Sequence, residues 1–472
     1  MESLQFVYPE IVLAIFALGL VILGAFSPSR KTFGILALSG VIMSILFLPL
    51  SCQMQRNLFF GMLVNDAFSV FFRQIILLIA FFVLLLSIGY KEGNEDDRGE
   101  YYFFILTVTL SMLLAVSTNN LLMIYLTLEA VSVISYLLAG YSKRDVFSSE
   151  AGMKYFIFGS LSTGITLYAI SLIYGLFRTL DLPLIFSNLA FVGESQSVLL
   201  FASILLLVGF GFKCSLVPFH MWTPDIYEGA PTPVAALLSV GPKAMGFAFL
   251  LRVFLYHFQP LVSNWFSLAG TISLLTMTIG NVMALRQNNI KRLLAYSTIA
   301  QAGYILLGLA IGTPEGSKAT LFYIFVYTLM NLGAFGAVIA ISNNIKSETI
   351  EDYAGFYTRD PFTAIFLTVS LLSLAGIPPL AGFLAKFFIL AAVVESQYIL
   401  LAVITVINSV IAVYYYMNVI KVMFFCEPKD SSVVHKNLTL NLALSIATIG
   451  IVIIGIWPNS FIAWLTGLLY FK

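Results

Sequence analysis

Four ionisable side chains lie in the middle of stretches that otherwise have the composition of membrane-buried helix: Glu129, Lys213, Lys243 and Lys386. A charged residue at the centre of a bilayer costs roughly 2.5–3.5 kcal/mol even on the most lenient insertion scale. Such residues are therefore rare unless they have a use. Because amines and carboxylates exchange protons, their presence at membrane depth indicates ion movement.

All three buried cations are lysines rather than arginines. Burial favours the neutral amine and a nearby carboxylate favours the ammonium form, so a moving partner can switch a lysine. An arginine would stay protonated. Glu129 is the only carboxylate near the middle of a predicted span, and Tyr125 and Ser132 share its helix face and could hydrogen-bond it. We therefore expect proton transfer through these residues; for Glu129 the alternative is a structural ion pair between helices.

Several other polar residues have two open interpretations. Lys154 begins a predicted span, where it either extends to the membrane surface or takes part in proton transfer. His220 has an ordinary pKa of about 6.5. It could relay a proton between the first two buried lysines, or simply hydrogen-bond a broken helical turn. Arg73 and Arg252 are expected to be structural anchors.

Composition identifies an integral membrane protein. The 472 residues are 60% hydrophobic and 10% charged, whereas soluble domains carry about 25% charged residues. The net charge of +1 gives no reason to expect a nucleic-acid partner. The cysteines and histidines are too scattered to form a metal or cluster site, and no glycine-rich nucleotide fingerprint is present. We therefore expect no cofactor, metal or redox centre in this chain.

Apolar runs of membrane length predict an all-α protein of about fourteen transmembrane helices. The first run lacks the basic segment of a signal peptide, so we interpret it as a retained span. The spans are expected at 8–26, 33–50, 67–90, 101–117, 119–140, 150–176, 198–217, 231–256, 265–285, 290–311, 317–341, 361–394, 397–425 and 438–466.

The distribution of basic residues predicts the orientation. One set of alternate connections holds fourteen of them, and the other set, with the C-terminus, holds four. By the positive-inside rule the richer side is cytoplasmic, which places both termini on the opposite side. The richer set is Arg30, Lys31, Lys91, Arg98, Lys143, Arg144, Arg286, Lys291, Arg292, Lys346, Arg359, Lys421, Lys429 and Lys436; the other is Arg56, Arg178, Lys318 and Lys472.

Proline interrupts the predicted helix next to the first buried lysine. In GFGFKCSLVPFHMW (209–222), Pro218 cannot donate to the carbonyl of Cys214, so the helix should open just after Lys213. Pro242 similarly precedes Lys243 and predicts a weakened turn there. Open backbone at membrane depth is tolerated only where it faces protein or a water-filled cavity.

A second interruption precedes the last buried lysine. In LAGIPPLAGFLAKFF (374–388), Pro378 and Pro379 free the carbonyls of Leu374 and Ala375 shortly before Lys386. Interrupted segments at matching places in two halves of a membrane protein indicate an inverted repeat and its ion site. The two breaks lie five predicted spans apart, which predicts two inverted five-helix repeats, spans 4–8 and 9–13. The expected division is 1–100 (helices 1–3), 101–256 (first repeat), 265–425 (second repeat) and 438–472 (helix 14).

Three stretches of this chain resemble one known family. They are PFHMWTPDIYEGAPTPVAALLSVGPKA (218–244), RQNNIKRLLAYSTIAQAGY (286–304) and GIPPLAGFLAKF (376–387). Together they resemble the antiporter-like membrane subunits of respiratory complex I (NADH-quinone oxidoreductase), a family shared with multisubunit sodium/proton antiporters and membrane-bound hydrogenases. The lysine at 386 and the motif MWTPDIYEGAPTPV are most similar to the subunit N branch.

The resemblance implies a function for the buried residues. Glu129, Lys213, Lys243 and Lys386 match the family's glutamate and lysines of the fifth, seventh, eighth and twelfth helices. Gln301 stands where many members have histidine, so the tenth span is not expected to carry a protonatable relay. Tyr304, a possible relay, could with Ser297 and Thr298 still organise water.

The expected function is proton translocation in the bacterial inner membrane. Redox chemistry in partner subunits, which would hold the flavin and iron–sulfur clusters, would change the charge near Glu129 and Lys154. A proton would then pass from Lys213 through Lys243 to Lys386. The expected partners are the other membrane-arm subunits and membrane lipids. Two alternatives stay open: a subunit of a gradient-driven sodium/proton antiporter or related hydrogenase or ferredoxin-linked complex, and a structural scaffold.

Overall fold

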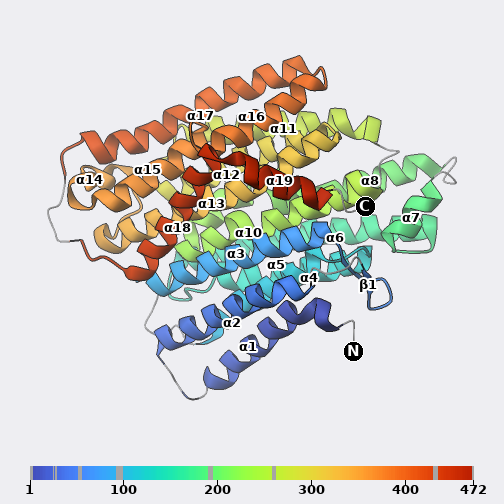
Figure 1. Cartoon of the computed structure of the whole chain (residues 1–472), viewed down its shortest axis with the longest axis horizontal. Coiled ribbons are helices and arrows are strands. Elements are labelled where there is room, and N and C mark those ends of the chain that lie inside the picture. Colours follow the sequence, from blue (N-terminus) through green and yellow to red (C-terminus); the bar gives the residue numbers. More distant parts are fainter. Residues whose placement is uncertain are drawn as a thin grey trace.

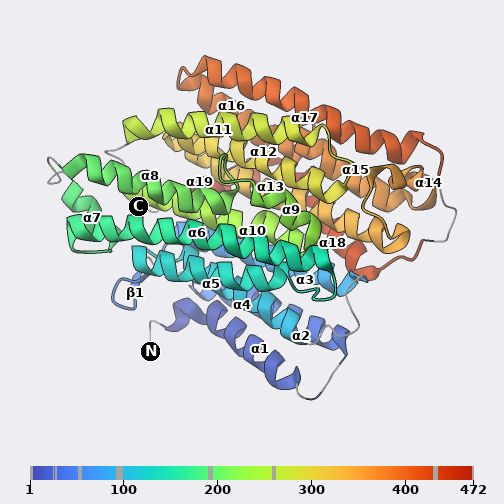
Figure 2. The ribbon, with the colours of Figure 1, turned by 180° about the vertical axis from the view of Figure 1, so that it is seen from behind.

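Long, apolar helices lying side by side build the structure (Figure 1). The computed structural model describes residues 4–24, 26, 29–51, 56–91, 99–189, 195–257, 262–428 and 434–469. Within these ranges, thirteen helices are long and apolar enough to cross a membrane. Helices α1 and α2 lie at one edge of the bundle and α16 and α17 at the opposite edge (Figures 1 and 2).

The element bounds follow the predicted spans closely. The described elements are η1 (Leu4–Val7), α1 (Tyr8–Gly24), α2 (Arg30–Ser51), β1 (Arg56–Leu58), β2 (Leu63–Asn65), α3 (Ala67–Gly89), α4 (Gly99–Val116), α5 (Leu121–Ala139), α6 (Val146–Phe177), α7 (Leu182–Asn188), α8 (Gln196–Cys214), α9 (Trp222–Gly229), α10 (Thr232–Leu250), η4 (Leu251–His257), α11 (Val262–Ala284), α12 (Ile290–Ala310), α13 (Pro314–Ile345), η6 (Ile350–Tyr353), α14 (Phe356–Arg359), α15 (Pro361–Ala375), α16 (Ala381–Glu395), α17 (Ile399–Phe425), α18 (Leu438–Ile456) and α19 (Pro458–Leu469).

The predicted membrane-spanning, all-helical architecture is confirmed, with a few differences. The predicted span 361–394 consists of two shorter helices, α15 and α16, and the span around Lys213 ends at Cys214 before the short helix α9. The prediction of one helix over 438–466 is wrong, because α18 ends at Ile456 and α19 starts at Pro458, whose ring nitrogen cannot continue the helical hydrogen bonds. Strands β1 and β2 form a small antiparallel hairpin that the sequence pattern did not indicate.

Three helices form the centre of the bundle. The most apolar stretches of α10 and α12 are entirely buried, and α13 is nearly so. By contrast, α1, α17 and α18 bury only about a third of theirs and leave large apolar side chains at the surface, such as Leu400. A polar side chain on α10, α12 or α13 therefore faces other protein groups rather than lipid.

The two arginines predicted to be anchors occupy structural positions. Arg73 of α3 pairs with Glu10 of α1 at 3.1 Å and donates to the Ser117 hydroxyl at 2.8 Å. Arg252, in η4 after α10, donates to both carboxylate oxygens of Asp66 at 2.9 and 3.1 Å. Burial alone would raise the pKa of Asp66, but the charge and hydrogen bonds of Arg252 hold it below its ordinary value of 3.8. These pairs join the first helices to the bundle.

Replacing Arg252 should destabilise the fold strongly. The substitution Arg252→Met leaves the Asp66 carboxylate buried without its partner, which typically costs about 3–5 kcal/mol. We expect a clear drop in the thermal unfolding midpoint of the detergent-solubilised protein. The double variant Arg252→Met/Asp66→Leu should recover part of the loss.

The pH dependence provides a second readout of the same pair. Because the folded-state pKa of Asp66 is lowered, the pair contributes its stability above about pH 3.8 and loses it as the pH falls below that value. The double variant should lack this acidic component. Lys143→Met, which removes an exposed cation, is the matched control; equal midpoints for Arg252→Met and this control would contradict a structural role.

Candidate functional site

The first buried lysine sits where its helix ends. Helix α8 stops at Cys214, and the next residue, Ser215, adopts a left-handed conformation with φ of 59°. Leu216 N–H turns back to donate to the carbonyl of Gly211 at 2.8 Å. This C-terminal turn satisfies freed carbonyls in the usual way and leaves Lys213, which is 1% exposed, in the last turn before the break. The predicted opening after Lys213 is confirmed.

The amine of Lys213 is surrounded by aromatic rings. Its Nζ lies 5.6 Å from the ring centre of Tyr155, 5.8 Å from that of Phe212 and 6.0 Å from that of Tyr136. It has no hydrogen-bond partner among the described residues. The half-buried Glu129 is close enough for its charge to act on Lys213, but the two form no direct ion pair. Three aromatic rings therefore border this amine, and no anion is bonded to it directly.

The suggested hydrogen bonds from Tyr125 and Ser132 to Glu129 are absent. The Ser132 hydroxyl donates instead to the carbonyl of Leu128 within its own helix at 2.5 Å. A serine hydroxyl inside a helix commonly donates to the backbone carbonyl one turn earlier, and that bond takes the place of a bond to another side chain. Tyr125 interacts with Glu129 only through its electrostatic field. The carboxylate of Glu129 therefore keeps its acceptor capacity for other partners.

The second buried lysine lies on a continuous central helix. Lys243 is 2% exposed, and its Nζ donates to the backbone carbonyl of Thr298 on α12 at 3.4 Å. Helix α10 runs unbroken through Pro242, so the predicted weakened turn does not appear as a break. His220 lies half-buried in the turn before α9, with its ring beside the backbone of Pro218 and within electrostatic reach of Lys243.

The third buried lysine is bonded to the second helix break. Lys386, on α16, donates to the carbonyl of Ala375 at 2.8 Å and lies 4.8 Å from the ring centre of Tyr304. Ala375 is the last residue of α15, so its carbonyl is one of the two that the prolines were predicted to free. Gly376, with φ of 88°, turns the chain there, and a Cβ on it would come within 2.8 Å of the Lys386 Cδ. The break thus provides both the acceptor and the space for the lysine.

Gln301 is hydrogen-bonded to the other carbonyl that this break frees. Its amide nitrogen donates to the carbonyl of Leu374 at 3.0 Å, and its amide oxygen accepts from the Tyr323 hydroxyl at 2.5 Å. Gln301 lies on α12 one turn after Thr298, the acceptor of Lys243. An uncharged side chain that both donates and accepts a hydrogen bond therefore stands between Lys243 and Lys386.

A polar stripe on α13 completes this region and was missed in the sequence. Tyr323, Tyr327 and Asn331 are spaced four residues apart and so share one face of a buried helix. The Tyr327 hydroxyl donates to the carbonyl of Ser239 at 3.0 Å, and the Asn331 amide donates to the Ser239 hydroxyl at 2.6 Å. The regular spacing of polar groups in an apolar stretch was the signal that would have found them.

Further hydroxyls border Gln301 and Tyr304. Ser297 of α12 hydrogen-bonds the hydroxyl of Tyr416 on α17. The Tyr304 hydroxyl accepts from the Asn281 amide at 3.3 Å, while the Asn281 oxygen accepts from Tyr415 at 3.1 Å. Tyr304, a candidate relay, therefore has its ring against Lys386 and its hydroxyl in a polar cluster.

Lys154 belongs to an ion-pair cluster near one end of the bundle rather than to the buried set. It is 38% exposed and lies 2.8 Å from both Glu150 and Asp225. Arg292 on α12 joins the cluster at 2.9 Å from Asp225 and 2.6 Å from Glu228. Burial would raise the pKa of Asp225, but its hydrogen bonds and charge interactions with the two cations lower it overall. The cluster ties α6 and α12 to α9.

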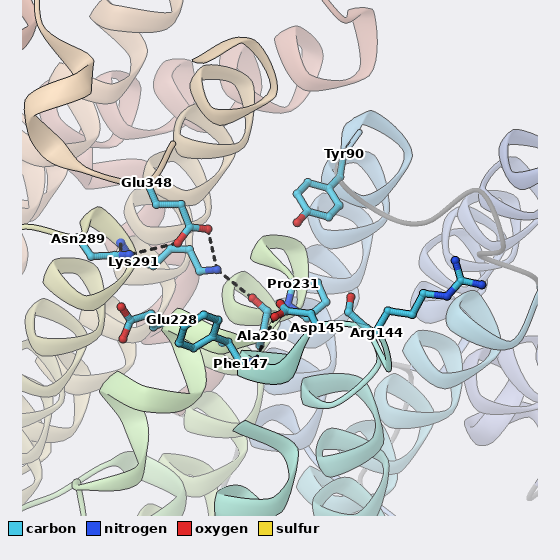
Figure 3. Close-up of a pocket in the computed structure, with 12 residues that line it drawn as sticks. Tyr90, Arg144, Asp145, Phe147, Glu228, Ala230, Pro231, Asn289, Lys291 and Glu348 are labelled. Atoms are coloured by element: carbon cyan, nitrogen blue, oxygen red, sulfur yellow. Dashed lines mark hydrogen bonds and ion pairs between the residues drawn. The ribbon is translucent and has the colours of Figure 1, made fainter. Parts of the chain in front are cut away.

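A polar cavity of about 500 Å³ lies beside this cluster (Figure 3). Its walls come from the turn before α6, the end of α9, the start of α12 and the segment before η6. The buried Lys291 donates to Glu348 at 2.8 Å and to the carbonyl of Ala230 at 3.0 Å. The Arg144 side chain points away from this pair in Figure 3. The wall thus combines acidic, basic and backbone polar groups that water can solvate.

No metal-binding cluster is formed by the described residues: no three His, Cys, Asp or Glu side chains gather closely enough. Within the same ranges Cys214 is buried and Cys426 exposed, and both are free thiols. Cys52, and the basic residues Arg98, Lys429 and Lys472 used for the orientation, lie outside the described residues.

Comparison with known proteins assigns the family. Residues 118–412 match the family model described as NADH:quinone oxidoreductase/Mrp antiporter, transmembrane. A NADH-quinone oxidoreductase subunit N of Trichlorobacter lovleyi is 42% identical over 97% of this chain and 95% of its own length. One of Desulforamulus reducens is 40% identical, with 95% and 94% covered. The chain belongs to this family. The resemblance to its subunit N branch is thereby confirmed.

Solved structures share the fold. A chain of respiratory complex I from Thermus thermophilus matches with a TM-score of 0.82 and 31% identity, covering 96% of this chain and 98% of that one. A chain of the Mrp complex from Dietzia has a TM-score of 0.86 at 20% identity, over 99% and 97% of the two chains. At that identity the likeness to the Dietzia chain concerns the fold alone.

Placing a methyl group at the second break should disable Lys386. The substitution Gly376→Ala forces a left-handed conformation on alanine and drives its Cβ into the Lys386 side chain. We expect the amine to leave the Ala375 carbonyl and proton pumping by the assembled complex to fall at least several-fold.

A matched control separates this effect from a general helix perturbation. Gly164→Ala lies on α6, where a Cβ would meet nothing within 4 Å, and should pump normally. Normal pumping by Gly376→Ala in a fully assembled complex would contradict the role assigned to the break.

Proposed function

We propose that this chain is a proton-translocating, subunit-N-type component of the membrane arm of a respiratory NADH:quinone oxidoreductase. The relatives named as subunit N match this chain over nearly their whole lengths. The chain's own contribution is a row of buried amines inside a helical bundle. Quinone reduction would take place elsewhere in the complex and drive the movement of protons through this row.

One observation carries the proposal: the backbone freed by the second helix break is bonded by side chains that reach it from two directions. Lys386 takes the carbonyl of Ala375, and Gln301 takes that of Leu374. Gln301 is one turn from Thr298, whose carbonyl accepts from Lys243. A hydrophilic connection therefore runs between two amines through the centre of an otherwise apolar bundle.

The proposed route starts at the ion-pair cluster of Lys154, Asp225 and Arg292 and the neighbouring cavity. These lie among the connections that hold most basic residues, which the positive-inside rule assigns to the cytoplasm. A charge change arriving from partner subunits would shift Glu129 relative to Lys213. The proton would pass from Lys213 to Lys243 and then to Lys386, with His220 and Tyr304 beside the route. It would leave on the side opposite the cytoplasm.

The electrostatic coupling between neighbouring sites is large enough for switching. At an effective dielectric constant of 20, two unit charges 6 Å apart interact by about 3 kcal/mol. This energy corresponds to a change of roughly a hundred-fold in a protonation equilibrium. Moving Glu129 by a few ångströms could therefore decide whether Lys213 holds its proton.

The same proposal fixes the setting of the chain. The protein is a multi-pass membrane protein. We place it in a bacterial inner membrane, with both termini on the non-cytoplasmic side. Its partners would be the small membrane subunits and the next antiporter-like subunit, while flavin and iron–sulfur clusters would be held by other subunits of the complex.

A second function is favoured by one finding. The matching family model includes Mrp antiporter subunits as well as NADH:quinone oxidoreductase subunits, so a subunit of a multisubunit sodium/proton antiporter is the alternative. A related hydrogenase or ferredoxin-linked membrane complex belongs to the same alternative. Affinity purification of the intact complex decides between them: flavin and iron–sulfur subunits support the proposal, and antiporter subunits alone contradict it.

Replacing Lys213 tests whether proton exchange, rather than charge, is needed. Lys213→Ala removes the amine, and Lys213→Arg keeps a cation that does not deprotonate. We expect both variants to assemble and to lose most pumping per quinone reduced, measured in proteoliposomes. Lys143→Arg at the surface is the control. Near-normal pumping by Lys213→Ala, or by Glu129→Ala, would contradict the proposal.

A quadruple variant of Glu129, Lys213, Lys243 and Lys386 tests the third reading, in which the chain is only a scaffold. We expect pumping to fall to the level of the strongest single variant. Because these residues act in series, their effects should not add. Wild-type pumping by this variant would show that the buried charges serve no transport.

A further inference from the structure

We propose that Tyr136 and Tyr155 are positioning residues for Lys213, holding its ammonium form by their ring faces and linking it to water through their hydroxyls. This inference rests on the proposed function, since it assigns the partners of the first lysine in the route. It concerns the amine that lacks the backbone acceptor found for Lys243 and Lys386.

The two tyrosines are fixed in place by close packing. The Tyr155 ring lies parallel to the Trp222 indole, with centroids 4.7 Å apart and an interplanar angle of 10°. Tyr136 packs edge-on against Tyr155 at 4.9 Å. Beneath Tyr136, Gly159 leaves the necessary space, because a Cβ there would fall 1.8 Å from the Tyr136 hydroxyl oxygen. The rings that face Lys213 therefore have little freedom to move away.

Three buried polar groups lie around the rings of Tyr136 and Tyr155 with few protein partners. The Lys213 Nζ and the Tyr155 hydroxyl form no hydrogen bond with any described residue. Within the described part of the chain, the Tyr136 hydroxyl has only the neighbouring Ser132 oxygen as a partner, because Ser132 itself donates to the carbonyl of Leu128. A buried hydroxyl or amine left unbonded is costly, and such groups are usually satisfied by ordered water. The three groups together provide enough donors and acceptors to hold water beside the amine.

Ring faces suit a lysine that must lose and regain its proton. An aromatic face attracts the ammonium form through its quadrupole and gives the neutral amine little. That attraction is weaker than a buried ion pair, so it favours the charged form without locking it. The titratable groups that face Lys213 from the surrounding helices are Glu129 and Tyr136 on α5 and Tyr155 on α6, with Tyr227 of α9 next to Tyr155. Helix α10 presents Gly246 to the Lys213 side chain. Only Glu129 among these titratable groups is an anion.

The aromatic rings around Lys213 are also connected to the ion-pair cluster of Lys154 at the end of the bundle. Tyr155 follows Lys154 directly in the chain, and Trp222 lies three residues before Asp225, the partner of Lys154. The stacked pair and the ion pair therefore connect the same two helices, α6 and α9. Figure 2 shows α6 and α8, the helix of Lys213, side by side. A displacement of α9 relative to α6 would change the stacking of Trp222 on Tyr155, the ring that faces the lysine.

Paired substitutions separate the ring from the hydroxyl. Tyr136→Leu and Tyr155→Leu remove the ring face, and Tyr136→Phe and Tyr155→Phe remove only the hydroxyl. Proton pumping by the reconstituted complex is measured as a function of pH, with Tyr102→Leu and Tyr102→Phe as controls at a buried tyrosine of α4. Assembly of each complex is checked by native gel.

The two kinds of variant should behave differently. Without a ring, the ammonium form loses its attraction, so the alkaline midpoint of the pumping profile should move to lower pH by about one pH unit. The Phe variants should keep the midpoint and lose several-fold in maximal rate, because water is held less well. Unchanged midpoints and rates in all four variants would overturn the inference, and so would an equal midpoint shift in the Phe and Leu variants.

The result is separable from that of the proposed function. If Lys213→Ala abolishes pumping while the tyrosine variants match wild type, only the positioning role fails. If Lys213→Ala pumps normally, the function itself fails. Should a Leu variant not assemble, the Phe variants still test the hydroxyl, and Phe variants with wild-type rates would overturn it.

Discussion

The cost of placing an amine inside an apolar bundle governs this structure. A lysine at membrane depth needs either an acceptor or a polarisable surface for its charge. Carbonyls inside a regular helix already accept backbone hydrogen bonds, and the one that serves Lys243, that of Thr298, lies 3.4 Å from its amine. Two other helices are broken, which frees carbonyls completely. At the second break the carbonyl of Ala375 accepts a hydrogen bond from Lys386 at 2.8 Å, and the first break leaves Lys213 in the last turn of α8. The prolines and glycine that break these helices therefore determine the surroundings of the buried lysines.

The three lysines differ in how firmly they are held. Lys386 has a short bond to a carbonyl, Lys243 a long one of 3.4 Å, and Lys213 only ring faces. A uniform set of strong partners would trap the proton at one site. Under the proposed function, graded contacts would let a single charge change near Glu129 alter the proton occupancy of the next site.

Much of the fold was predictable because membrane spans are set by length and hydrophobicity. The predicted spans reappear as helices, except that 361–394 and 438–466 are each divided into two. The breaks after Lys213 and before Lys386 follow from proline's missing donor. The break at Trp457 was overlooked because Pro458 lies within a long apolar run, where composition hides it.

The site was only partly predictable. Buried charges are easily recognised against an apolar background. The partners of Gln301, of Tyr323 and of the rings around Lys213 depend on contacts between helices far apart in sequence, which the sequence pattern does not reveal. The suggested bonds to Glu129 failed for a related reason, since helix position cannot tell that Ser132 bonds its own backbone.

The most direct measurement is a high-resolution structure of the assembled complex in a lipid environment, with ordered water resolved around the buried amines. A chain of water molecules should link Lys213 to Lys243 and reach Lys386 past Gln301 and Tyr304, with water also bonded to the Tyr136 and Tyr155 hydroxyls. Dry, apolar packing between Lys243 and Lys386 in both resting and turning-over complexes would contradict proton transfer along this row.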